Sequence, residues 1–150
     1  MHIFLATEFT DTLYRELMSL ALVTAGGDEL YVEFTDYNRT RVSEFAAEVV
    51  EPLLGKTPCA ILGEKAVIQA HVQAFVDRHA EDVVACSSNV DWWLLSELLD
   101  GALTTELHGL NVAAAMDIMR EQHYYAKQRV PRHHALHKAR ALRDACTKTT

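Results

Sequence analysis

The order of hydrophobic and polar residues along the chain predicts a sheet whose strands alternate with helices. Short apolar or alternating runs closed by glycine or polar residues are typical of strands, whereas apolar residues at every third or fourth position indicate helices. Strands are expected at His2–Ala6, Leu17–Thr24, Glu29–Phe34, Asp82–Cys86 and Leu103–Leu107. Helices are expected at Thr40–Leu54, Gly63–Ala80, Asp91–Leu99, Asn111–Gln128 and His133–Cys146.

The first three strands follow one another closely. Gly26-Gly27-Asp28 separates Leu17–Thr24 from Glu29–Phe34, so these two segments are expected to pair as a hairpin. The later strands are separated by helices, which are the connections that parallel strands need. We therefore expect a mixed α/β sheet with three antiparallel strands at its start, parallel strands after them, and helices on its faces.

Length and composition indicate one soluble domain that comprises residues 1–150. The chain has 150 residues, of which 49% are hydrophobic and 23% charged, close to the averages of globular proteins. These values exclude a mainly disordered, fibrous or coiled-coil protein, and the 6 glycines and 3 prolines exclude a low-complexity one.

The same pattern gives no reason to expect a membrane protein or a secreted one. The longest uncharged stretches, such as Ala66–Val76 and Leu107–Met116, are too short to span a bilayer. The first residues lack the basic region of a signal peptide. Three cysteines without a C-x-x-C spacing indicate neither a disulfide framework nor a zinc ribbon, so we expect a cytoplasmic location.

Charge is distributed unevenly along the chain, whose net charge is −7. Lys127–Thr150 holds seven basic residues and a single acidic one, Asp144, so the rest of the chain is strongly acidic. Such an end either forms a positive stripe that binds an anionic ligand or is simply a solvated helix face.

Three polar residues lie where α/β proteins build active sites. Glu8 follows the first strand, and Asp91 follows a later strand after Ser87-Ser88-Asn89. Carboxylates just beyond strand ends are common in such sites, although a single one is more often a solvated loop residue. His133, in the basic end of the chain, is a candidate general base.

Three segments carry a family resemblance. The first is Phe4-Leu5-Ala6-Thr7-Glu8-Phe9-Thr10, the second Asn89-Val90-Asp91, and the third His133-His134-Ala135-Leu136-His137-Lys138-Ala139. In this order they resemble the motifs of the ribonuclease-H-like 3′–5′ exonucleases of the four-acid, one-histidine (DEDDh) type, which read Asp-x-Glu, a single Asp, and His-x-Ala-Leu-x-Asp-Ala. Val49–Gly55 is similar to a helix end in a small bacterial exoribonuclease branch. The resemblance covers nearly the whole chain and implies a ribonuclease-H-like fold.

The resemblance also implies a chemistry. Family members hydrolyse terminal phosphodiesters with two Mg²⁺ or Mn²⁺ ions held by four carboxylates, while the histidine accepts a proton from the attacking water. By this resemblance Glu8 and His133 are the catalytic residues, and Glu8 and Asp91 are metal ligands. Ala6 and Lys138 stand where the family has its other two aspartates. Because an ammonium group repels a dication, we expect one metal ion or none.

Two functions remain open at this point. The first is a 3′–5′ exonuclease acting on single-stranded RNA or on 3′ overhangs of RNA or DNA, impaired or inactivated by Ala6 and Lys138. The second is a non-catalytic module, either a nucleic-acid binder or a homodimeric scaffold, that keeps the fold without the metals. Ala6 is either an engineered change or the natural residue, and its combination with Lys138 favours natural divergence.

Further residues are predicted to hold the substrate or to replace the lost ligands. Phe9 can stack on a terminal base or pack in the core, and basic side chains can follow the phosphates. The expected nucleic-acid contacts are Phe9, Thr10, Arg129, Arg132, Lys138 and Arg140. Replacement ligands are sought at Asp11, His137 and Asp144, although Asp144 is expected to point away from Lys138. The spacing of His133 and His137 indicates either a shared helix face able to bind Zn²⁺ or two solvent-facing histidines.

Overall fold

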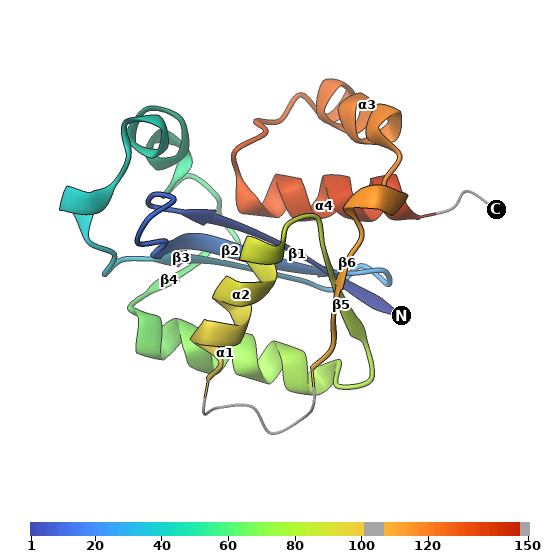
Figure 1. Cartoon of the computed structure of the whole chain (residues 1–150), viewed down its shortest axis with the longest axis horizontal. Coiled ribbons are helices and arrows are strands. Elements are labelled where there is room, and N and C mark those ends of the chain that lie inside the picture. The colour runs from blue at the N-terminus through green and yellow to red at the C-terminus, as the bar shows by residue number, and fades with distance from the viewer. Residues whose placement is uncertain (101–106, 148–150) are drawn as a thin grey trace.

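The computed structural model describes residues 1–100 and 107–147, which form one mixed α/β unit (Figure 1). Its strands are β1 His2–Phe9, β2 Leu17–Thr24, β3 Glu29–Phe34, β4 Ile61–Gly63, β5 Val83–Cys86 and β6 Gly109–Asn111. Its α-helices are α1 Lys65–Arg78, α2 Asn89–Leu98, α3 Ile118–Gln128 and α4 Ala135–Cys146. In this described part of the chain, no helix has the length and apolar character needed to cross a membrane.

The six strands form a single sheet in the order β4-β3-β2-β1-β5-β6. Strands β1, β2 and β3 are antiparallel neighbours, while β4 pairs in parallel with β3, and β5 and β6 continue in parallel from β1. The predicted mixed sheet with an antiparallel start is therefore confirmed. Because β1 and β5 are parallel, the residues that follow both strands meet at the same edge of the sheet.

Helices cover both faces of the sheet, with α1 and α2 on one side and α4 on the other (Figure 1). Side chains of a strand alternate between the two faces. In β1, Ile3 and Leu5 belong to the large core that includes α1 and α2, whereas Phe4 and Ala6 belong to the smaller clusters with α4. α3 packs against the outer side of α4. Side chains from helices on both faces of the sheet can therefore contact the end of β1.

The predicted helix at Thr40–Leu54 is confirmed only in part, because residues 44–53 are helical without forming a regular α-helix. This stretch consists of short 3₁₀ and π turns, at Arg39–Arg41, Ala46–Val50 and Glu51–Leu53. Pro52 has no backbone N–H to continue an α-helix, and it stands in the first turn of the last segment. Of its apolar residues, Ala46 and Val50 are buried, whereas Phe45 is 54% exposed.

The region after α2 also departs from the prediction. The strand expected at Leu103–Leu107 lies, apart from Leu107, outside the described residues. The helix expected from Asn111 begins only at Ile118, where the Asp117 side chain accepts a hydrogen bond from the Arg120 backbone N–H. The residues before it form β6 and a 3₁₀ turn at Ala113–Ala115. The three-residue strands β4 and β6 were not predicted.

Candidate functional site

Glu8 and Lys138 form an ion pair at the end of β1. The Lys138 Nζ atom is 3.1 Å from Glu8 Oε1, and it donates a hydrogen bond of 2.9 Å to the backbone carbonyl of Thr7. Even-numbered residues of β1 face α4, so Glu8 and Lys138 approach each other from the strand and from the helix. Glu8 is only 7% exposed, which makes the pair a partly desolvated one.

Asp91 reaches the same strand end from the other face of the sheet. It lies in the first turn of α2, and its Oδ1 atom accepts a hydrogen bond of 2.6 Å from the Thr7 hydroxyl. Burial raises the pKa of Asp91, while the Lys138 ammonium and the Thr7 hydroxyl partly offset that increase. Lys138 therefore interacts with both predicted metal ligands.

Ala6 is a residue of β1 whose side chain faces α4, in a contact made of small side chains. Ala6, Ala135 and Ala139 belong to one buried cluster, which lets the helix lie close to the strand. A cavity of about 180 Å³ opens beside Ala6 and Lys138, and Ser87, Arg132 and His133 also line it. The predicted site residues Glu8, Asp91 and His133 thus gather around Lys138, although their chemical roles stay predictions.

A second cavity, of about 450 Å³, is lined by Glu8 itself. Its apolar lining comes from Phe9, Phe45, Ala46 and Val50. Phe45 was not predicted from the sequence as a site residue. It is 54% exposed, and its ring makes an edge contact with the His133 ring at 5.0 Å between centroids. Only the three-dimensional arrangement brings this aromatic side chain to the site, because it comes from the irregular segment before β4.

The predicted nucleic-acid contacts separate into two groups. Thr10 is completely buried and its hydroxyl accepts a hydrogen bond from the Glu16 backbone N–H, so it presents no surface to a ligand. Arg140 forms two hydrogen bonds with Glu29, at 2.9 and 2.6 Å, away from the Glu8 pair. Arg129 is exposed at the end of α3. The buried position of Thr10 therefore contradicts its predicted contact, whereas the contact of Arg140 with nucleic acid stays a prediction.

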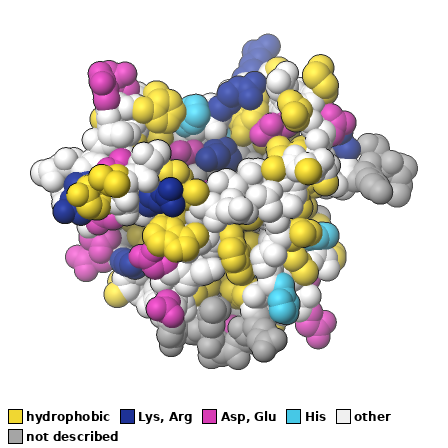
Figure 2. Space-filling model, viewed as in Figure 1, with side chains coloured by type: hydrophobic (Ala, Val, Ile, Leu, Met, Phe, Trp, Pro, Cys, Tyr) yellow, Lys and Arg dark blue, Asp and Glu magenta, His cyan; other side chains and the backbone are white. Residues whose placement is uncertain are grey.

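Arg132, like Lys138, remains at the site. It lines the cavity beside Lys138, and its guanidinium lies over the Tyr125 ring at 4.6 Å. Figure 2 shows basic side chains near the connection between α3 and α4, with acidic side chains close to them. The basic end of the chain is thus partly neutralised by its neighbours.

None of the replacement ligands joins the Glu8 pair. The Asp11 carboxylate accepts hydrogen bonds from the backbone N–H groups of Tyr14 and Arg15, and Asp144 lies 3.9 Å from Arg120. His133 precedes α4, which begins at Ala135, so His133 and His137 do not share a helix face. The alternative of a shared helix face is thereby excluded, because the helix starts two residues later than expected.

The residues at this strand end do not fit the two-metal centre of the resembling family. Ala6 offers no ligand, and the Lys138 ammonium contacts the Glu8 carboxylate that a dication would need. Across residues 1–100 and 107–147, no group of three or more His, Cys, Asp or Glu side chains is arranged to hold a metal ion.

A buried histidine lies next to the site, and sequence reasoning missed it. His134 is 5% exposed, and its ring stacks between Tyr31 and His137 at centroid distances of 4.7 and 4.4 Å. Its Nε2 atom shares a hydrogen bond of 2.9 Å with the Thr57 hydroxyl. Burial, reinforced by His137 and Arg140, lowers the pKa of His134 to about 4. The signal in the sequence was its place in an otherwise apolar run, His134-Ala135-Leu136.

His134 is expected to make the fold less stable in mild acid. Between pH 6.5, near the pKa of an unfolded histidine, and pH 4, His134 is protonated in the unfolded chain but remains neutral in the folded chain. As the pH decreases through this window, the contribution of His134 to the free energy of unfolding therefore decreases, by at most about 3 kcal/mol. Urea unfolding at several pH values measures this slope. His134→Phe, which keeps an aromatic ring in the stack, should flatten it, and an unchanged slope would contradict the assignment.

The site thus joins residues of β1, α2 and α4 around one lysine, with one cavity lined by Lys138 and another lined by Glu8. Neither a scan against protein-family models nor a search of curated proteins finds a match for this chain.

Proposed function

We propose that this chain is a ribonuclease-H-like domain that binds the 3′ end of single-stranded RNA or DNA and does not hydrolyse it. The observation that carries the proposal is the position of Lys138 between Glu8 and the Thr7 carbonyl, at 3.1 and 2.9 Å. An ammonium group there neutralises carboxylates that metal ions neutralise in the resembling exonucleases. The proposed site keeps its shape while the hydrolytic chemistry is lost.

The sheet supports the fold part of the proposal. An antiparallel β1-β2-β3 start, followed by β5 and β6 in parallel with β1, agrees with the arrangement that the three motifs imply. Glu8 and Asp91 come from the strand end and the helix start where such proteins place their carboxylates.

The two cavities support the choice of ligand. The apolar cavity of about 450 Å³, with Phe9 and Phe45 in its wall, has the size and chemistry to take a nucleobase. The smaller cavity brings Arg132, His133 and Lys138 together, where a phosphate would meet N–H donors. Because Glu8 lines the larger cavity and its partner Lys138 lines the smaller one, a terminal nucleotide at this ion pair would reach both cavities.

Oligonucleotide binding tests this function directly. A short single-stranded RNA is expected to bind in EDTA, with an affinity that falls as salt rises, because phosphate contacts release counterions. Phe45→Ala and Arg132→Ala should each weaken binding about five- to tenfold, as expected for a lost stacking or charge-assisted contact. Fluorescence anisotropy with a 3′-labelled and a 5′-labelled strand measures these affinities.

Arg78→Gln is the matched control for charge. Arg78 lies in the last turn of α1, on the opposite face of the sheet from α4, so binding should not change. Absence of binding at low salt, or equal losses for Arg78→Gln and Arg132→Ala, would reject the proposed function.

The catalytic alternative is a metal-dependent 3′–5′ exonuclease that uses Glu8, Asp91 and His133. It retains these three residues but has Ala6 and Lys138 in place of two ligands. Shortening of the labelled strand by the unmodified chain in Mg²⁺ or Mn²⁺ would favour this alternative over non-catalytic binding.

A further inference from the structure

The outer edge of β6 has no neighbouring strand in the part of the chain that the structure describes. The Val84 N–H donates to the His108 carbonyl at 2.9 Å and the Val112 N–H to the Cys86 carbonyl at 2.8 Å, so His108 and Val112 face β5. Backbone groups alternate along a strand, and therefore those of Gly109 and Asn111 point away from β5. Within the residues that the structure describes, no strand pairs with this side of β6.

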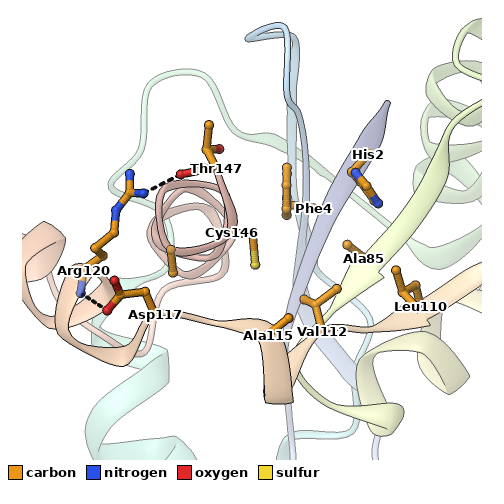
Figure 3. Close-up of a pocket in the computed structure, with 11 residues that line it drawn as sticks. His2, Phe4, Ala85, Leu110, Val112, Ala115, Asp117, Arg120, Cys146 and Thr147 are labelled. Atoms are coloured by element: carbon orange, nitrogen blue, oxygen red, sulfur yellow. Dashed lines mark hydrogen bonds between the residues drawn. The ribbon is translucent and has the colours of Figure 1, made fainter. Parts of the chain in front are cut away.

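An apolar row of side chains runs across the sheet and ends at this edge. Phe4, Ala85 and Leu110 are lateral neighbours on β1, β5 and β6, on the face that carries α4. Phe4 and Ala85 are buried, whereas Leu110 is 45% exposed. The three side chains line a cavity of about 420 Å³, which Val112 and Cys146 help to enclose (Figure 3). The row therefore stops in solvent although its inner members belong to the core.

We infer that two copies of this chain pair through their β6 edges in antiparallel fashion, about a two-fold axis at Leu110. In that arrangement Gly109 of one protomer faces Asn111 of its partner, and each such pair exchanges two backbone hydrogen bonds. The two Leu110 side chains meet as a closely spaced, non-hydrogen-bonded pair. The apolar row then continues from one sheet into the other, and the outward backbone groups of both β6 strands are hydrogen-bonded.

A second copy fits this edge better than a partner of different chemistry. A two-fold contact requires a surface that complements itself, and β6 carries no charged side chain that would meet its own copy. This matters because the chain has a net charge of −7, so two copies repel each other and a contact without charged side chains is favoured.

The opposite edge of the sheet provides the comparison. β4 is also three residues long and exposes a leucine, Leu62, which is 56% exposed. The cavity beside Leu62 contains the charged residues Glu33, Arg39 and Glu51 among its apolar lining, whereas the apolar row at β6 contains none. Pairing of two β4 edges would place these charges near their copies, so the proposal concerns β6 alone.

Leu110→Glu and Leu62→Glu form a matched pair of variants for the test. Sedimentation velocity over a concentration series is expected to show a monomer–dimer equilibrium for the unmodified chain. Leu110→Glu should weaken the dimer about 100-fold or more, because it places two carboxylates at the axis, whereas Leu62→Glu should leave it unchanged. Amide hydrogen exchange should show Gly109 and Asn111 protected at dimer concentrations and exposed on dilution.

Three results would overturn the inference. One is a monomer at every concentration, another is a dimer that survives Leu110→Glu, and the third is a dimer that Leu62→Glu dissociates. If Leu110→Glu does not fold, the exchange of Gly109 and Asn111 in the unmodified chain decides, since unchanged exchange on dilution contradicts β6 pairing. The outcome is independent of nucleic-acid binding, which is measured separately.

Discussion

Replacing Ala6 and Lys138 together with aspartate is expected to create a divalent-cation site and to make stability depend on metal. The double variant would bring four carboxylates to the end of β1, with Glu8 and Asp91 already 7% and 5% exposed. Without a cation these charges repel one another, so the variant should be less stable than the unmodified chain in EDTA. Saturating Mn²⁺ should then raise its melting temperature by about 5–10 °C, as binding to the folded state alone implies.

A cation site is expected to require both substitutions, because Lys138 contacts Glu8. With Ala6→Asp alone, the Lys138 ammonium still lies 3.1 Å from Glu8 Oε1 and can also pair with the new carboxylate. That single variant should show neither Mn²⁺-dependent stabilisation nor shortening of an oligonucleotide. The comparison between single and double variants therefore isolates the effect of Lys138.

Thermal unfolding in EDTA and in Mn²⁺, with a parallel assay of a labelled strand, checks this prediction. We expect Mn²⁺-dependent shortening from the 3′ end by the double variant. Adding His133→Ala should abolish shortening but keep the thermal shift, since His133 is assigned to proton transfer and not to metal binding. A double variant that unfolds at the same temperature with and without Mn²⁺ would reject the kinship with the exonucleases at this site.

Lys138→Met is expected to lower the free energy of unfolding by roughly 3 kcal/mol, which is at the low end for removing one partner of a buried pair. The low end applies because the Lys138 side chain is still 31% exposed, whereas its partner Glu8 is almost fully buried. Loss of the ammonium also removes an interaction that lowers the pKa of Asp91. Two carboxylates would then remain at the strand end without their common cation.

The pH dependence of this loss has a definite sign. Protonation removes the uncompensated charge, so the difference between Lys138→Met and the unmodified chain should shrink as the pH falls toward 4. Urea unfolding at pH 7 and at lower pH values measures the difference. Lys127→Met, at an exposed position of α3, is the control and should change stability by less than about 0.5 kcal/mol. Equal stability of Lys138→Met and the unmodified chain at pH 7 would show that the ion pair contributes nothing.

Local pattern was sufficient for β2 and β3, whereas β1 continues to Phe9, beyond the predicted end at Ala6, so that Glu8 lies within the strand and not after it. β2 and β3 begin and end where the alternation and the glycine-rich turn predicted, because a run of apolar residues must be buried wherever it lies. The three-residue strands β4 and β6 escaped prediction, since so short a strand is defined by the backbone of its neighbour and not by its own residues. The segment 40–54 shows the converse, in which an apolar period is buried without forming an α-helix.

The sequence by itself determined the mixed α/β class and the three segments from which the candidate site is drawn, because hydrophobic period and motif order are local properties. Only the tertiary structure decided that Lys138 contacts Glu8, that the Thr7 hydroxyl bonds to Asp91, and that Phe45 reaches His133. It also showed that Thr10 is buried and that Arg140 is paired with Glu29. The physical reason is that a side chain's partner and its desolvation depend on which elements pack around it, and residues distant in the chain supply those elements.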